Sequence, residues 1–359
     1  MLIVLATGPL TTVQDLGRTG AAALGVTRSG AADVPAAALA NRLVGNRPEA
    51  ALLEVTAGGL RVRAGRTVLV AVTGAPAPVE IDGRAAPFAA PTTLRAGSVL
   101  ALGAPRRGLR SYVAVRGGLD VPPVLGSRST DTLSGLGPPP VAAGTELPVG
   151  DLAGGEPFVD VAPVGHLPDR PVLRVLPGPR RDWLADAAWA ALTTQEWRVG
   201  SDSDRVGLRL TGPRLDRARD GELPSEGLVP GALQVPPDGA PVLFLADHPV
   251  TGGYPVLAVV VTADLPLAAQ LRPGDALRFR PLPGAGVRGR MSRWRVSAWS
   301  WVPAAWSARP TTPASWPCSS TTSASTPGRP TWSSAPPPAP SPGRCCGSGC
   351  GPRTSPRGP

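Results

Sequence analysis

The chain has 359 residues, a formal net charge of +10 from 36 basic and 26 acidic residues, two His and four Cys. It contains no lysine, which excludes a P-loop lysine, a Schiff-base lysine and a lysine that carries biotin. Two histidines cannot build a multi-histidine metal centre, so we predict no metal site.

The charge is spread unevenly, and the composition changes near residue 284. Residues 285–359 contain nine Arg, no acidic residue, all four Cys and six of nine Trp, but no Leu, Ile, Phe or Tyr. So few core-forming side chains cannot offset the entropy of ordering, and we predict a disordered tail. Its composition favours translation past a frameshift over a natural extension, and both over an arginine-rich arm. The remainder is nearly neutral, which argues against nucleic-acid binding.

The chain begins with MLIVLATGPL, which has neither a basic region nor a small-residue cleavage site. No apolar run approaches the ~20 residues of a membrane span. We therefore expect a cytoplasmic protein. The turn TTVQDLGRTG follows, and its Gln14, Asp15 and Arg18 are candidates for orienting a substrate. The alternative is an Asp–Arg pair that only pins the turn.

A helix is predicted after SGAADVP. Asp33 is placed to cap its N-terminus, Pro35 suits its first turn, and Leu39 and Leu43 share one face. Asn41 lies within the apolar sequence of this helix and needs a hydrogen-bond partner if it is buried. Two more helices are predicted in RDWLADAAWAAL (181–192) and DLPLAAQL (264–271).

Short β-rich runs bounded by Gly and Pro dominate the rest of the chain, among them RTVLVAVTG, PVLRVLPGP, PVLFLAD and DALRFRPL. This spacing predicts a mainly β protein made of sandwiches or barrels rather than βαβ units. The stretch GDLAGGEPFVDVAPVGHLPDRP lacks periodicity and is typical of a connector. We expect a first β domain at 1–150, a connector at 151–170, a second β domain at 171–284 and the tail at 285–359.

The segment SDSDRVGLRLTG (201–212) is predicted to be a half-buried strand with polar groups on one face. That face would carry Ser203, Arg205, Gly207 and Arg209. Two guanidiniums side by side suit a carboxylate or phosphate, and a glycine between them leaves room for a ligand. The alternative is a pair of exposed arginines on an edge strand.

Three later stretches carry further candidates. Glu226 suits acid–base work, and Gln234 suits amide recognition. TGGYP (251–255) can present backbone N–H groups to an anion or an oxyanion, or form only a tight hairpin. His248 is the one candidate histidine base, although a lone loop histidine is more often merely solvated.

Seven blocks, in order, closely resemble the carboxyltransferase subdomain A/B family over residues 1 to about 281. They are GPLTTVQDLGRTG, SGAADVPAAALANRLVGN, LEVTAGG, VRGGLDVPPVLGSRST, SDSDRVGLRLTG, PSEGLVPGALQVPPDGAPVLFLADHPVTGGYP and ADLPLAAQLRPGDALRFR. The resemblance implies two cyclophilin-like β-barrel subdomains with a few short helices. Within these blocks we predict catalytic roles for Gln14, Asp15, Arg205 and Glu226, and substrate contacts for Arg18, Ser29, Asn41, Ser203, Arg209, Gln234, Thr251, Gly252, Gly253 and Tyr254.

Members of this family include the C subunit of 5-oxoprolinase (KipA) and an allophanate hydrolase-like protein related to urea amidolyase. The resemblance implies one part of an ATP-dependent enzyme complex that hydrolyses 5-oxoproline to glutamate, a part that is inactive alone. The implied partners are the KipI-like B and LamB/YcsF-like A subunits of 5-oxoprolinase. ATP would contact arginine and backbone groups here, or bind a partner.

Two alternative functions remain open. One is a biotin-dependent carboxyltransferase, with the biotin attached to another chain because this one has no lysine. The other is a KipA-type regulator that binds a kinase-inhibitor subunit.

Overall fold

Strands β1 to β11 lie within residues 2–147, which we call the first half, and the later strands lie within residues 172–281, which we call the second half. Their bounds are Leu2–Thr7 (β1), Leu10–Gln14 (β2), Leu52–Thr56 (β3), Leu60–Ala64 (β4), Val68–Gly74 (β5), Val79–Ile81 (β6), Arg84–Ala86 (β7), Thr92–Leu94 (β8), Val99–Leu102 (β9), Arg110–Val115 (β10) and Glu146–Leu147 (β11). The computed structural model describes residues 1–157 and 159–282, so the predicted tail lies outside the described residues. Residues 1–282 fall within one compact unit.

The strands of the first half form two sheets. One has the order β11-β1-β4-β9-β6-β7 and the other β2-β3-β10-β5-β8. Apolar side chains from both sheets fill one shared core, which includes Val4, Leu53, Val62, Val72 and Val113. The strands of this half are thus paired in two sheets around one core, whereas those of the second half form one closed ring. Sandwiches and barrels both bury one face of each strand, so the alternation of apolar residues does not separate them.

Helix α1 (Val34–Leu43) covers the second sheet, where it contacts β3, β5 and β10. The Asp33 carboxylate accepts a hydrogen bond from the Ala36 N–H at 3.1 Å, so the predicted N-cap is confirmed. Asn41 is buried in this helix, and its amide donates to the Ala50 carbonyl at 2.8 Å and accepts from Asn46 at 3.0 Å. These bonds explain why a polar residue lies on the apolar face.

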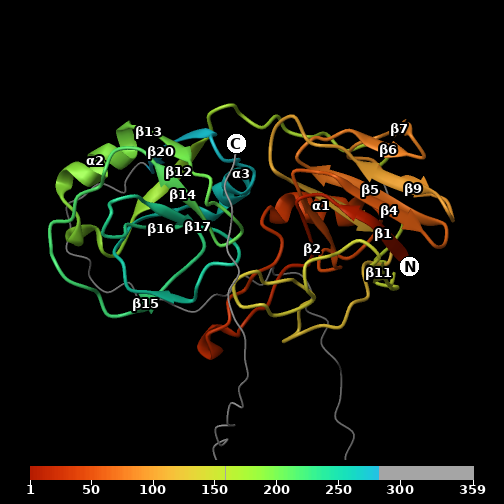
Figure 1. Ribbon diagram of the computed structural model, residues 1–359, viewed down its shortest axis with the longest axis horizontal. Coiled ribbons are helices and arrows are strands. Elements are labelled where there is room, and N and C mark those ends of the chain that lie inside the picture. The colour runs from red at the N-terminus through yellow and green to blue at the C-terminus, as the bar shows by residue number, and fades with distance from the viewer. Residues whose placement is uncertain (158, 283–359) are drawn as a thin grey trace, which may run out of the picture. The chain divides into compact units, whose positions relative to one another are not determined.

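The second half is a closed barrel with the strand order β12-β19-β16-β17-β14-β13-β20 (Figure 1). The strands are Val172–Pro177 (β12), Glu196–Val199 (β13), Gly207–Thr211 (β14), Ala232–Gln234 (β16), Val242–Phe244 (β17), Val256–Val260 (β19) and Ala276–Pro281 (β20). The parallel pairing of β12 with β20 closes the ring. Trp197, Leu243 and Phe279 lie in its core. The mainly β fold class is thus confirmed.

Short elements complete the second half. Strands β15 (Glu226–Gly227) and β18 (Thr251–Gly252) form a two-stranded ribbon. Helix α2 is Asp186–Thr194 and α3 is Leu265–Ala269, each preceded by a 3-10 turn, at Arg181–Trp183 and Thr262–Asp264. The predicted second helix therefore begins five residues later than 181, because its first residues form the tighter turn. A third 3-10 turn spans Ala22–Leu24 in the first half.

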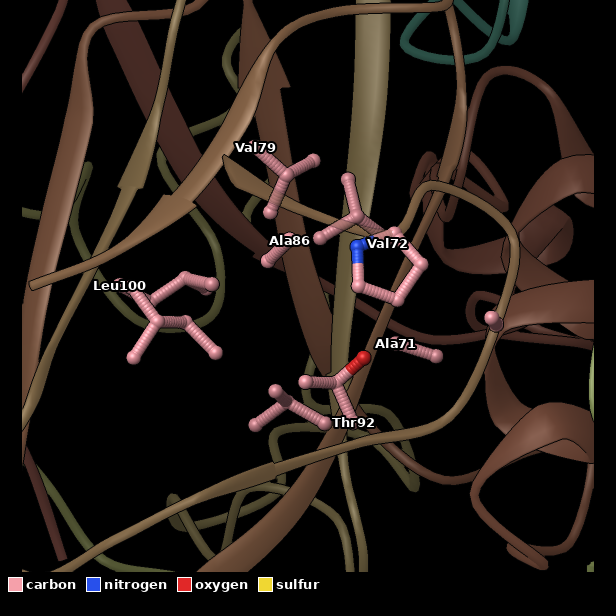
Figure 2. Close-up of a pocket in the computed structure, with 10 residues that line it drawn as sticks. Ala71, Val72, Val79, Ala86, Thr92 and Leu100 are labelled. Carbon is pink, nitrogen blue, oxygen red and sulfur yellow. The ribbon is translucent and has the colours of Figure 1, made fainter. Parts of the chain in front are cut away.

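A small space between strands of the first half is packing and not a ligand site. Side chains from β5 to β9 surround it, and it has no room for a water molecule. Figure 2 shows Val72, Val79 and Leu100 around this space, with Thr92 contributing the only side-chain oxygen among the residues drawn. That hydroxyl is buried and has no hydrogen-bond partner.

Replacing Thr92 by valine should stabilise the protein by about 1 kcal/mol, because it removes an unsatisfied hydroxyl without changing the shape of the side chain. The free energy of unfolding from urea titration measures the effect. Thr93→Val is the matched control, since Thr93 is exposed on the same strand and its replacement should change stability by less than about 0.5 kcal/mol. A destabilised Thr92→Val protein would contradict this account of the space.

Candidate functional site

Arg205 is buried, with 1% of its surface exposed, and links the two halves of the chain. Its Nε and Nη2 donate to the two oxygens of Asp247 at 2.9 and 3.0 Å. Its Nη1 donates to Glu54 on β3 in the first half, and its Nη2 also reaches the Gly30 carbonyl at 2.7 Å. Every guanidinium nitrogen therefore has a protein partner.

Each carboxylate that faces Arg205 has further donors. The second oxygen of Glu54 accepts from the Tyr112 hydroxyl and the Ala32 N–H, both at 2.9 Å. Asp247 accepts from the Ser29 hydroxyl at 2.7 Å and from the N–H and hydroxyl of Thr132 at 3.0 and 2.7 Å. Glu54 and Asp247 are both fully buried. We call Glu54, Arg205 and Asp247 the ionic triad.

A second buried link runs beside the triad. Gln270, which follows α3, accepts from the N–H groups of Leu109 and Arg110 at 2.9 Å each and donates to Asp33 at 2.8 Å. Arg110 donates to the Ala269 carbonyl, and its Nε lies 3.5 Å from Glu54. The buried polar groups therefore join the C-terminal part of the barrel to the start of α1.

The electrostatics of the triad keep Asp247 and Arg205 charged. Burial acts to raise the pKa of Asp247, but the charge of Arg205 and its hydrogen bonds outweigh burial and hold that pKa below its usual value. Burial likewise opposes the charge on Arg205, yet the two carboxylates raise the pKa of its guanidinium. Burial and then the charge of Glu54 raise the pKa of Tyr112 well above its ordinary value. Tyr112 is thus a neutral hydrogen-bond donor to Glu54.

Arg205 and Arg209 do not share a face, contrary to the sequence prediction. Asp204 accepts from the N–H groups of Val206 and Gly207 at 2.7 and 3.1 Å, which turns the chain just before β14. The alternation of a strand therefore starts only at Gly207, so that Arg205 points into the interior while Arg209 is exposed. Ser203 accepts from the Arg209 N–H at 3.1 Å and supports this turn.

The predicted turn at Gln14, Asp15 and Arg18 lies against residues 127–130. Asp15 accepts from the hydroxyls of Ser127 and Ser129 at 2.7 and 2.5 Å and from the Arg128 N–H at 2.6 Å. Gln14 donates to the Thr130 carbonyl at 2.9 Å, and Arg18 donates to the Ser129 carbonyl. Asp15 pairs with the loop and not with Arg18, so the Asp–Arg interpretation of the turn is wrong.

This turn adjoins the triad through one carbonyl. Ser29 donates to the Thr130 carbonyl at 3.2 Å as well as to Asp247, and Gln14 donates to the same carbonyl. Gln14, Ser29 and Arg205, which lie far apart in the sequence, therefore belong to one connected set of contacts. The guanidinium of Arg209 is not part of that set.

The remaining candidates gather elsewhere, on the ribbon of the second half. Glu226 pairs with Gly252 across β15 and β18, and Arg180 binds its carboxylate with Nε 2.9 Å from both oxygens. Gln234 donates to the Tyr254 carbonyl at 3.0 Å. A Cβ on Gly252 would lie 2.6 Å from the Gln234 amide nitrogen, so a larger residue there would require the Gln234 side chain to move.

The ribbon shows little sign of acid–base chemistry. The hydrogen bonds from Arg180 lower the pKa of Glu226, so it is an ionised carboxylate at neutral pH and a poor proton donor. Thr251 and Tyr254 are exposed, Gly253 is partly exposed, and Tyr254 stacks over Arg217 at 5.8 Å. No hydrogen bond or ion pair between described side chains joins Glu226 or Gln234 to the triad.

Several residues of the hydrogen-bond network around the ionic triad were not predicted from the sequence. They are the buried residues Asp247, Arg110, Gln270 and Thr130, and the exposed Thr132 that donates to Asp247. Asp247 ends the apolar run PVLFLAD and Arg110 opens the apolar strand RSYVAV, which is the one local signal of a charge at the edge of a core. His248 lies beside the triad, and burial lowers its pKa. Among residues 1–157 and 159–282, no three His, Cys, Asp or Glu lie close enough to hold a metal ion.

Replacing Arg205 by methionine should lower the free energy of unfolding by about 3–5 kcal/mol, because buried Asp247 loses its counter-charge and Glu54 keeps only Arg110. Because the triad is buried, Arg205 belongs to the fold as well as to the candidate site. Arg209→Met is the matched control and should change stability by less than about 0.5 kcal/mol. Equal urea midpoints for the two variants would contradict the structural role of the triad.

Comparison with known proteins shows the relationships of the chain. The family "Carboxyltransferase domain, subdomain A and B" matches residues 24–281. The chain is 39% identical over 282 residues to the 5-oxoprolinase C subunit of Escherichia coli (strain K12), covering 78% of this chain and 90% of that protein. It is 33% identical to urea amidolyase of Saccharomyces cerevisiae, covering 77% of this chain but 16% of the yeast protein.

Two solved structures are also similar to this chain. The crystal structure of TTHA0988 matches with a TM-score of 0.70 and 38% identity, covering 77% of this chain and 55% of that one. The urea amidolyase of K. lactis matches with a TM-score of 0.73 and 30% identity, covering 78% of this chain and 18% of that one. The chain belongs to the carboxyltransferase domain, subdomain A and B, family.

Proposed function

We propose that this chain is the C subunit of an ATP-dependent 5-oxoprolinase, which hydrolyses 5-oxoproline to glutamate together with its A and B subunits. One observation carries the proposal: the similarity to the E. coli 5-oxoprolinase C subunit extends over 90% of that protein at 39% identity. A second such relative, from Haemophilus influenzae, is 32% identical over the same share of its length.

The contacts of the candidate residues support a division of labour within this proposal. Arg205 has no nitrogen left for a substrate, so it acts as a positioning residue that fixes Glu54 and Asp247 across the two halves. Asp15 holds the loop 127–129 by its hydrogen bonds. In this proposal the substrate contacts neighbouring side chains whose hydrogen-bond donors and acceptors are not used within the chain. ATP, in this proposal, binds mainly to a partner, because the chain has no P-loop lysine.

Carboxyl transfer is the second candidate function, and the urea amidolyase relatives favour it. The chain spans less than a fifth of the S. cerevisiae protein, whereas it spans nine-tenths of the E. coli one. The absence of lysine means that biotin would have to be carried by another polypeptide. We therefore rank carboxyl transfer below 5-oxoproline hydrolysis.

The full chain, coexpressed with the A and B subunits encoded in the same genome, should release glutamate from 5-oxoproline only when ATP is present. The chain alone should release none, because the proposal makes it one part of a three-subunit enzyme. Glutamate formation, followed by an enzyme-coupled assay, measures the activity. Carboxyl transfer from a carboxybiotin carrier to urea, with no glutamate formed from 5-oxoproline, would instead establish the second candidate.

A further inference from the structure

Arg18 is a buried cation without an anionic partner. Only 1% of its surface is exposed, yet no carboxylate of the described residues lies within 4.0 Å of its guanidinium. Its Nη2 donates to the Ser129 carbonyl, while its Nε and Nη1 have no hydrogen-bond partner. Burial of an unpaired charge is strongly unfavourable, so an anion from outside the chain is the expected partner.

Arg205 shows what a compensated buried arginine looks like in the same protein. It has the same 1% exposure, but two carboxylates and a carbonyl occupy its nitrogens. The two arginines are linked through adjacent residues, since Arg18 binds the Ser129 carbonyl and Ser29 joins the Thr130 carbonyl to Asp247. The missing counter-charge is therefore confined to Arg18.

Other unsatisfied polar atoms belong to the same turn and loop. Seven buried side-chain nitrogen and oxygen atoms of the described residues lack a hydrogen-bond partner, and four of them belong to Gln14, Arg18 and Thr130. The four are the Gln14 amide oxygen, the Thr130 hydroxyl and the two Arg18 nitrogens. Gln14 and Thr130 are held together by the 2.9 Å bond from the Gln14 amide to the Thr130 carbonyl. This pairing leaves the amide oxygen as an acceptor.

We propose that Gln14, Arg18 and Thr130 form a binding site for a small carboxylate that carries an N–H group on the adjacent carbon. The Arg18 nitrogens donate to the carboxylate, the Gln14 amide oxygen accepts from the ligand N–H, and the Thr130 hydroxyl donates to a ligand oxygen. 5-Oxoproline has this arrangement, with its lactam N–H one carbon away from its carboxylate. The choice of 5-oxoproline as the ligand rests on the proposed function, whereas the need for an anion does not.

A segment beside the site lies outside the strands of both sheets. Residues 19–26, which follow Arg18, are mostly exposed, and Leu24 at their tip is 73% exposed. The Arg18 N–H donates to the Arg28 carbonyl at 2.7 Å and closes the base of this segment. Movement of this segment would therefore leave the strand pairing of both sheets unchanged. The hydrogen bonds that Asp15 accepts from residues 127–129 hold that loop in place.

The test compares the full chain with its Arg18→Met variant, each alone and assembled with the A and B subunits, by calorimetric titration with 5-oxoproline. The wild-type assembly should bind 5-oxoproline saturably, and Arg18→Met should weaken binding at least tenfold. Methionine removes an uncompensated charge, so the melting temperature of the variant without ligand should stay at or above the wild-type value. Arg205→Met, the matched buried arginine, should melt lower.

Ligand analogues test the chemistry of the site. 2-Pyrrolidone, which lacks the carboxylate, and N-methyl-5-oxoproline, which lacks the N–H, should each bind at least tenfold more weakly than 5-oxoproline. Thr130→Val should weaken 5-oxoproline binding in a variant that melts like the wild type, and Gln14→Leu should weaken it too but melt lower, because the Gln14 amide also donates to the Thr130 carbonyl. Inorganic phosphate or bicarbonate binding as tightly as 5-oxoproline would overturn the amide-carboxylate assignment.

The site and the proposed function fail in different ways. Binding that is lost in Arg18→Met, in an assembly that forms no glutamate, would refute the proposed function and keep the site. Glutamate formation with wild-type kinetics in Arg18→Met would refute the site and keep the function. An Arg18→Met protein that melts as low as Arg205→Met would show that Arg18 is structural, and would overturn the proposal.

Discussion

The structure depends on the neutralisation of one buried arginine by two buried carboxylates from different halves of the chain. Without the other half, Glu54 would keep only Arg110, whose Nε lies 3.5 Å away, and Arg205 would lose one of its two anions. The triad and the hydrogen bond from Gln270 to Asp33 hold the two-sheet half and the barrel in a fixed position against each other. The turn that carries Gln14 and Arg18 is held against the same loop residues, so its geometry depends on the triad through Thr130 and Ser29.

Local sequence patterns predicted the helices and strands well, but they predicted contacts between distant residues less well. The Asp33 cap, helix α1 and the strand-rich composition follow from spacing within a few residues, so they were visible in the sequence. The sequence left open whether the strands form a sandwich or a barrel, because the two share the same alternation of apolar residues. The common face expected for Arg205 and Arg209 failed because the side chain of Asp204 bends the chain between them, a local hydrogen bond that alternation ignores.

The candidate residues fall into two groups that the sequence could not distinguish. Asp15, Asn41 and Arg205 have polar atoms occupied by their own chain, while Arg18 and Gln14 keep buried atoms without partners. Residue type alone does not separate the two groups, since the partners that satisfy Asp15 and Arg205 include residues a hundred or more positions away. The 111 residues that separate Arg18 from Ser129 illustrate that distance.

The parallel pairing of β12 with β20 has a consequence for biosynthesis. The barrel joins its first strand to its last, so the ring cannot be completed until Ala276–Pro281 has left the ribosome, whereas the first half needs nothing beyond Leu147 for its sheets. Folding is therefore expected to proceed vectorially, with the N-terminal sheets waiting for the barrel that supplies Arg205. The shift in composition near residue 284 follows the end of β20, so a change of reading frame there would spare every hydrogen-bonded strand of the ring.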